Sequence, residues 1–88
     1  SMQFEKTDKF DKELKNLSPI IRNKFFKNLR LFLSNKKHPS LNCEKITSPF
    51  YSIRINKNFR AIFYYPDSES ICFTHVANHD IYKKLKNL

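Results

Sequence analysis

The chain has 88 residues, room for one domain with a modest core, which excludes a second domain and a buried cofactor cavity. Lys and Arg number 17 against 8 Asp and Glu, a formal net charge of +9, so the expected partner is polyanionic: nucleic acid, an acidic protein or an anionic membrane surface. Glycine is absent, which argues against phosphate-cradling loops and nucleotide cofactors, because such loops need backbone without a Cβ.

The first half of the sequence predicts a strand and two helices. Residues 2–6 alternate as a short strand does, and Thr7 or Asp8 can cap a helix. The apolar residues of this helix recur with the spacing of one buried stripe: Phe10, Leu14 and Leu17. Ser18 followed by Pro19 marks the start of a second helix, since proline is tolerated in the first turn. Its core face is expected to carry Ile21, Phe25, Leu29 and Phe32.

The second half predicts strands and a closing helix. A polar loop at 34–39 precedes a short strand within 41–46, three strands at 51–55, 59–65 and 70–76, and a helix at 80–88. The segment 59–65 is apolar on both faces apart from Arg60, which predicts the centre of the sheet. His75 alternates in phase with Ile71 and Phe73 and is expected to be a partly buried structural residue.

The element order β-α-α-β-β-β-α predicts one α+β domain over residues 1–88, in which a helical hairpin packs on an antiparallel sheet and a short helix closes the chain. Cys43 and Cys72 are far apart and have no histidine at metal-ligand spacing, so we predict no zinc site, no disulfide and a reducing, cytoplasmic location. No apolar run approaches ~18 residues, so no membrane span is expected. Ser1 ahead of Met2 is interpreted as a remnant of tag removal, and no signal peptide is expected.

Four residues of the second half of the chain are candidates for a site that cuts RNA. Arg54 and Arg60 lie on adjoining predicted strands, and a guanidinium offers a planar fork that matches two phosphate oxygens. His79 lies where a helix begins, which favours a neutral imidazole able to act as a base, and Tyr82 is suited to stacking on an RNA base or donating a proton. The lysines expected to steer the phosphate backbone are Lys45, Lys57, Lys83 and Lys84.

Each candidate also has a structural interpretation. Arg60 can be a surface arginine at a strand end, and Arg54 can belong to a structural ion pair. His79 can cap its helix or face solvent, and Tyr82 can be a packed amphipathic aromatic residue.

Three stretches of the sequence resemble the RelE/ParE superfamily of bacterial toxins, in particular its RelE/YafQ-like mRNA interferase branch. Tyr-Ser-Ile-Arg-Ile (51–55) and Asn-Phe-Arg-Ala-Ile-Phe-Tyr (58–64) are similar to the family's strand–turn–strand, and Val-Ala-Asn-His-Asp-Ile-Tyr-Lys (76–83) to its last strand and terminal helix. Lys-His-Pro-Ser-Leu (37–41) is similar to the His-Pro-Leu stretch of a ribosome-dependent nuclease branch. This similarity adds His38 as a second candidate imidazole if its loop folds over the sheet; otherwise His38 is a solvated loop histidine. The resemblance implies the RelE-like fold.

This resemblance also implies a function. Such a toxin enters the ribosomal A site, cuts mRNA by metal-independent attack of a ribose 2′-hydroxyl on the adjacent phosphate, and is silenced by an antitoxin, here expected to be acidic. The reaction needs a base, cations for the phosphorane and an acid for the leaving oxygen, and no cofactor. Arg54 matches a family position that is often basic and catalytic, whereas Ser52 replaces the first of two lysines found in some members.

Two alternatives remain open. The ParE branch of this fold poisons DNA gyrase by protein contact, and a catalytically silent relative would keep only the fold, the basic charge and RNA binding. Breaks in mRNA on translating ribosomes would indicate the nuclease, gyrase-linked breaks in DNA the poison, and unaffected growth the silent relative.

Overall fold

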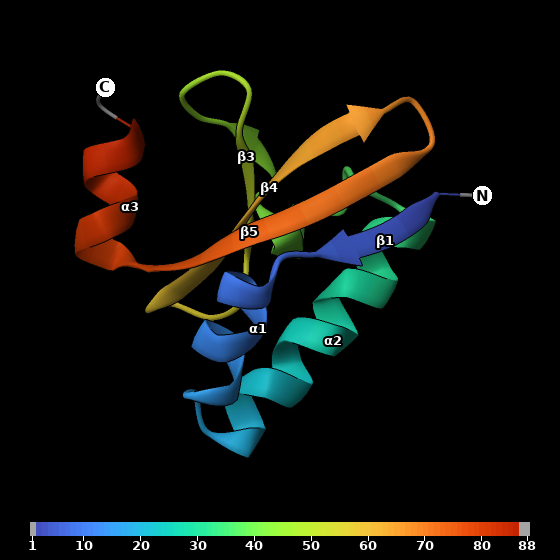
Figure 1. Ribbon diagram of the computed structural model, residues 1–88. Coiled ribbons are helices and arrows are strands. Elements are labelled where there is room, and N and C mark those ends of the chain that lie inside the picture. The colour runs from blue at the N-terminus through green and yellow to red at the C-terminus, as the bar shows by residue number, and fades with distance from the viewer. Residues whose placement is uncertain (1, 87–88) are drawn as a thin grey trace.

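A computed structural model describes residues 2–86 of the chain, so Ser1, interpreted as a tag remnant, lies outside the described residues. Three α-helices pack on one five-stranded sheet (Figure 1). In chain order the elements are β1 (Gln3–Lys6), α1 (Asp8–Lys15), α2 (Pro19–Ser34), the short 3₁₀ helix η1 (Pro39–Leu41), β2 (Glu44–Lys45), β3 (Tyr51–Arg54), β4 (Phe59–Asp67), β5 (Ser70–Asn78) and α3 (His79–Lys86). The predicted α+β class and element order are confirmed.

Both helices of the hairpin begin at the predicted caps. The Thr7 side chain accepts a hydrogen bond from the Phe10 amide at 3.1 Å, and Ser18 Oγ accepts one from the Ile21 amide at 3.3 Å. Pro19 is the first residue of α2. These caps satisfy amide groups that have no partner inside the first helical turn, which is why the sequence indicates both starts.

The sheet has the order β1-β5-β4-β3-β2, so β4 is central as predicted. Strands β2 to β5 are antiparallel to their neighbours, but β1 pairs with β5 in parallel. The sheet is therefore mixed rather than wholly antiparallel. No hairpin turn connects β1 to β5, and the direction of a strand cannot be read from its own residues, so the sequence carried no signal for this pairing.

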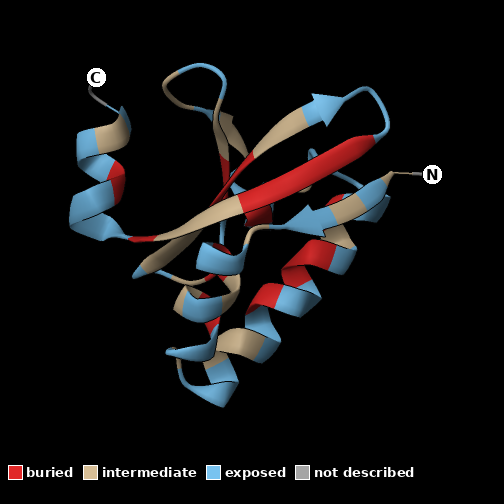
Figure 2. Cartoon of the chain, viewed as in Figure 1, coloured by how far each residue is buried: buried red, intermediate tan, exposed pale blue. Residues whose placement is uncertain are grey.

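The main core fills the space between the sheet and the helices α1 and α2. Four fully buried rings, Phe10, Phe25, Phe63 and Phe73, contact one another with centroids 5.2 to 5.4 Å apart. Buried residues run along β5 and along the inner side of α2 in Figure 2. This aromatic cluster fixes the sheet on which the site residues stand.

A shift of pairing register in β5 moves His75 to the other face of the sheet. Ile62 pairs with His75 while the next residue of β4 pairs with Phe73, so Thr74 is an extra residue in β5. His75 is partly buried, as predicted, but it does not share a face with Ile71 and Phe73. The predicted alternation was wrong at this point, because a bulge reverses which face of the sheet the following side chains occupy. No glycine or proline marks the position of this bulge in the sequence.

Helix α3 packs on the face of the sheet opposite α1 and α2. A small cluster of Ile62, Ala77 and Tyr82 lies beneath it, separate from the main core. The Thr47 hydroxyl donates a hydrogen bond of 2.6 Å to the Leu85 carbonyl and so attaches the end of α3 to the loop before β3. The helix begins one residue earlier than predicted, and 87–88 lie outside the described residues.

Within residues 2–86, every helix is too short or too polar to span a bilayer. Both cysteines, Cys43 and Cys72, are free thiols.

Asn28 connects α2 to the sheet and gives a stability prediction. Its side-chain amide, only 8% exposed, donates to the carbonyls of Arg54 at 2.7 Å and Ile55 at 3.3 Å. We expect Asn28→Ala to lower the free energy of unfolding by about 1–3 kcal/mol, because it leaves carbonyls without their donor. Asn23→Ala, on the exposed side of the same helix, is the matched control with the same gain in helix propensity. Equal urea midpoints for the two variants would contradict this role of Asn28.

Candidate functional site

A hollow of about 300 Å³ opens between α3, the β3–β4 turn and the segment just before β2. We call it the arginine hollow. The residues predicted for the site that line it are Arg54, Lys57, Arg60, His79, Tyr82 and Lys83. Elements far apart in the sequence therefore bring most of the predicted residues to one solvent-open place.

Arg54 and Arg60 enter this hollow from neighbouring strands. They are cross-strand partners in the antiparallel pair of β3 and β4, so their side chains leave the sheet on the same side. Arg54 is exposed, whereas Arg60 is half-buried. Two like charges held this close favour the binding of an anion between or beside them.

The Arg60 guanidinium is held in place from three directions. Its Nε donates to Ser52 Oγ at 3.3 Å, and its Nη2 donates to the Asn42 carbonyl at 2.7 Å. Its central carbon lies 4.5 Å from the centroid of the Tyr82 ring, the geometry of a cation–π contact. These contacts fix the orientation of the guanidinium relative to the hollow.

Burial lowers the pKa of the Arg60 guanidinium, and the charge of Arg54 lowers it further, whereas the nearby Glu44 carboxylate raises it. Arginine starts from so high a pKa that the group stays protonated near neutral pH. The hollow therefore contains a permanent, pre-oriented cation.

Tyr82 lies beneath Arg60 rather than facing the hollow with an open ring. It is 6% exposed, and its hydroxyl oxygen accepts a hydrogen bond from Ser52 Oγ at 3.4 Å. Because the guanidinium covers one face of the ring and the sheet lies behind it, little ring surface is left for an RNA base. The packed aromatic interpretation of Tyr82 fits this position, and base stacking does not.

His79 is the first residue of α3 and is exposed. The capping interpretation does not apply to it, because Asn78 Oδ1 accepts the hydrogen bond from the Ile81 amide at 2.9 Å and caps the helix. His79 thus has its ring available to a ligand in the hollow. The residues of α3 that line the hollow follow helical spacing along one side of the helix: His79, Tyr82, Lys83 and Lys86.

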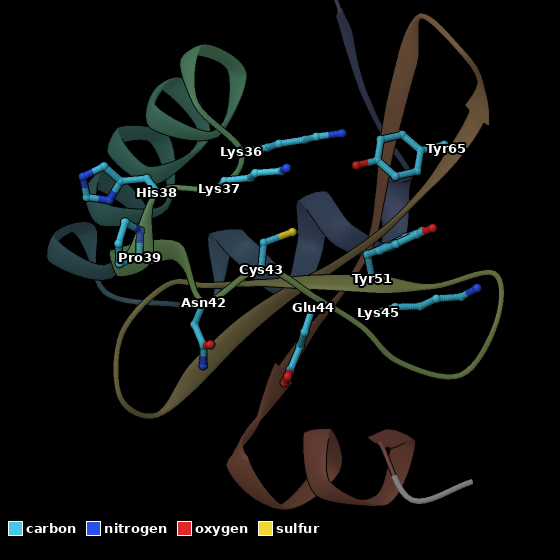
Figure 3. Close-up of a pocket in the computed structure, with 10 residues that line it drawn as sticks. All are labelled: Lys36, Lys37, His38, Pro39, Asn42, Cys43, Glu44, Lys45, Tyr51 and Tyr65. Atoms are coloured by element: carbon cyan, nitrogen blue, oxygen red, sulfur yellow. The ribbon is translucent and has the colours of Figure 1, made fainter.

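His38 and two of the predicted lysines lie elsewhere. His38 caps η1: its Nδ1 accepts a hydrogen bond from the Ser40 amide at 3.2 Å and lies 2.8 Å from Ser40 Oγ. With Lys45 it lines a second hollow of about 610 Å³ (Figure 3). Lys84 lines neither hollow. His38 therefore lines the second hollow and not the arginine hollow, and its role as a second imidazole stays a prediction.

Several residues that shape the arginine hollow were not predicted from the sequence. Ser52, noted only as a departure from the family pattern, is fully buried and bonds to both Arg60 and Tyr82. Lys86 forms an ion pair with Glu44 at 3.5 Å, and its position seven residues after His79 could have placed it on the same side of the helix. Asn42 contributes its backbone carbonyl, for which no side-chain pattern gives a signal.

Among residues 2–86 no group of three or more His, Cys, Asp or Glu side chains is arranged to hold a metal ion. The arginine hollow itself contains one carboxylate, Glu44, and one imidazole, His79.

Comparison with known proteins identifies the fold. No family model and no curated protein sequence matches the chain. Among solved structures, a YoeB/ParE toxin from Agrobacterium tumefaciens aligns with TM-score 0.72 and 12% identity, covering 89% of this chain and 99% of that one. A chain of the RelB–RelE antitoxin–toxin complex from Methanococcus jannaschii aligns with TM-score 0.69 and 21% identity, covering 91% and 96%. A chain of the Escherichia coli DinJ–YafQ complex aligns with TM-score 0.65 and 17% identity, covering 91% of this chain and 96% of that one.

These alignments span almost the whole of both chains, so the RelE-like fold implied by the sequence resemblance is confirmed. At such low identity the likeness concerns the fold, and activity has to be argued from the site.

The packing of Arg60 on Tyr82 gives a prediction for a double-mutant cycle. We expect Arg60→Met and Tyr82→Leu to couple by about 0.5–2 kcal/mol in urea unfolding, because either single variant removes the half-buried cation–π interaction. Tyr82→Phe keeps the ring and removes only the hydroxyl that bonds to Ser52, so it should retain most of the coupling. Additivity within about 0.5 kcal/mol would show that the interaction contributes nothing to stability.

Proposed function

We propose that the chain is the toxin of a type II toxin–antitoxin pair and that it cleaves mRNA on the ribosome. The observation that carries this proposal is the shared, open hollow lined by Arg54, Arg60 and His79. The RelE-like fold supports it, since similar structures include an antitoxin–toxin complex. The net charge of +9 supports a polyanionic substrate.

In the proposed reaction the two guanidinium groups bind the scissile phosphate. Arg60 presents a fork fixed by Ser52 and Asn42, and Arg54 adds a second charge from the paired strand. Because the fork is oriented before the substrate arrives, it can stabilise the charge that builds up on the phosphorane without reorganisation.

His79 is the proposed general base. It takes the proton from the ribose 2′-hydroxyl as that oxygen attacks the phosphorus, and the bond from phosphorus to the 5′ oxygen breaks. The products are a 2′,3′-cyclic phosphate and a free 5′-hydroxyl. In this proposal the leaving oxygen takes its proton from solvent, because the Tyr82 side chain is only 6% exposed and His38 lines the other hollow.

Lysines around the arginine hollow are suited to guiding the RNA backbone. Lys57 and Lys83 line it without a carboxylate partner among residues 2–86, whereas Lys86 is paired with Glu44. Binding through such lysines weakens as salt rises, because the release of counterions from the RNA is then less favourable.

The first functional prediction concerns the site residues. We expect Arg60→Ala to slow mRNA cleavage by about 10²–10³-fold and His79→Ala by about 10²–10⁴-fold, since each removes one charge or proton acceptor needed in the transition state. Arg30→Ala, an exposed arginine of α2 outside the hollow, should cleave like the original chain. The measurement is growth arrest after induction, with mapping of RNA 5′ ends, and thermal melts to confirm folding.

Two outcomes of this experiment would contradict the nuclease, and a third would contradict the assignment of its site. Gyrase-linked DNA breaks with intact mRNA would indicate a gyrase poison of the same fold. Unaffected growth for every variant would indicate a silent RNA-binding relative. Equal cleavage by the Arg30 and Arg60 variants would leave the arginine hollow without a catalytic role.

The second functional prediction concerns the partner. A chain of charge +9 is expected to be neutralised by an acidic antitoxin whose extended or helical segment covers the arginine hollow. Co-expression with the product of the adjacent gene should restore growth, and the two chains should copurify at low salt and separate more readily at high salt. A basic neighbour, or an acidic neighbour that fails to restore growth, would count against this pairing.

A further inference from the structure

A second hollow lies beside the arginine hollow and is the larger of the two. It is bounded by the loop between α2 and η1, by the segment leading into β2, and by the strands β3 and β4. We call it the loop hollow. In Figure 3 the side chains of Lys36 and Lys37 extend from the loop toward Tyr65, and Cys43 lies between the loop and the strands.

The loop hollow is strongly basic. Three lysines line it, Lys36, Lys37 and Lys45, and among residues 2–86 none of them forms an ion pair. Glu44 is the one carboxylate in the lining, and it is paired with Lys86 at 3.5 Å. Uncompensated cations around a concave surface attract an anionic ligand, because a hollow concentrates the field of the charges that line it.

Two tyrosines form the wall of the loop hollow on the strand side. Tyr51 and Tyr65 contact each other edge to face with centroids 5.0 Å apart, and both rings are only partly buried. Burial raises the pKa of the Tyr65 phenol and of the Cys43 thiol, so both stay neutral and add no negative charge. Aromatic faces beside lysines are the combination that binds single-stranded nucleic acid, since bases stack while cations contact phosphates.

The two hollows adjoin each other. Asn42 and Glu44 line both of them, and the Asn42 carbonyl that borders the loop hollow also holds Arg60 Nη2. Asn42 has a positive φ of 44°, the left-handed conformation that turns the chain sharply between η1 and β2. The turn at Asn42 therefore forms part of the boundary that the two hollows share.

We propose that the loop hollow binds the single-stranded RNA that adjoins the phosphate held in the arginine hollow. Lys36 and Lys45 contact its phosphates. The tyrosine pair offers an aromatic contact to a base from the side that lines the loop hollow, since one face of the Tyr51 ring is stacked on Phe63. This inference rests on the proposed nuclease function and adds a second binding subsite to it. RNA is favoured over an acidic peptide because carboxylate side chains make no use of the aromatic wall and because the loop hollow adjoins the proposed phosphate site.

The test is RNA binding rather than cleavage. A 2′-O-methyl hexanucleotide and a dinucleotide of the same kind, neither of which can be cut by 2′-hydroxyl attack, are titrated into the intact chain at low salt. The double variant Lys36→Ala Lys45→Ala is compared with Lys12→Ala Lys15→Ala, which has the same net charge but changes exposed residues of α1. Arg60→Met is measured beside them.

We expect the Lys36 and Lys45 variant to bind the hexanucleotide several-fold more weakly than the α1 control, with the dinucleotide unaffected. The slope of log Kd against log salt concentration should fall by about 0.7 for each phosphate that a lysine no longer neutralises, thus about 1.4 for the pair. Arg60→Met should weaken the binding of both ligands. This pattern supports a subsite for flanking RNA.

Two results would overturn the inference. If the Lys36 and Lys45 variant binds the hexanucleotide as the α1 control does, the loop hollow is not an RNA subsite, while Arg60-sensitive binding leaves the proposed nuclease standing. If the variant loses affinity for a hexaglutamate peptide and none for RNA, the loop hollow receives an acidic protein segment instead. Failure of the proposed nuclease is recognised separately, by intact mRNA after induction of the original chain.

Discussion

The arrangement of the site depends on the half-buried position of one cation, the Arg60 guanidinium. The Arg60 guanidinium rests on the Tyr82 ring and bonds to Ser52 and to the Asn42 carbonyl, so β4, β3, α3 and the segment before β2 meet at one group. A half-buried charge is tolerated only when its donors are satisfied and a polarisable or negative group lies nearby. Removing any of these supports therefore loosens the place where four parts of the chain join.

The need to support the half-buried Arg60 guanidinium gives the residues around it different roles. Tyr82 and Ser52 position the guanidinium and do not face the solvent, whereas Arg54 and His79 are exposed and free to contact a ligand. The positive charges that make up the net charge of +9 therefore act in two different ways. Part of it is held rigidly in the arginine hollow, and part lies on long lysine side chains that act at longer range.

Local patterns in the sequence predicted the helix starts, the central strand and most of the residues that meet in the arginine hollow. These features depend on short-range chemistry, such as the caps at Thr7 and Ser18 and the alternation that places Arg54 beside Arg60. The direction of β1, the extra residue at Thr74 and the position of the His38 loop were not predictable, because they follow from packing between distant segments. Ser52 was misjudged for the same reason, since its role depends on Tyr82 and Arg60, which lie in other elements of the fold.

The bulge in β5 limits the changes in strand length that are compatible with the site. Beyond Thr74 the strand runs with reversed phase until α3 starts, and the helix inherits its orientation from that phase. Deleting one residue there would turn the end of the strand over and carry the imidazole of the following helix away from the two guanidinium groups. Homologous chains that keep this site should accordingly accept many exchanges of residue type in β5, yet preserve its length.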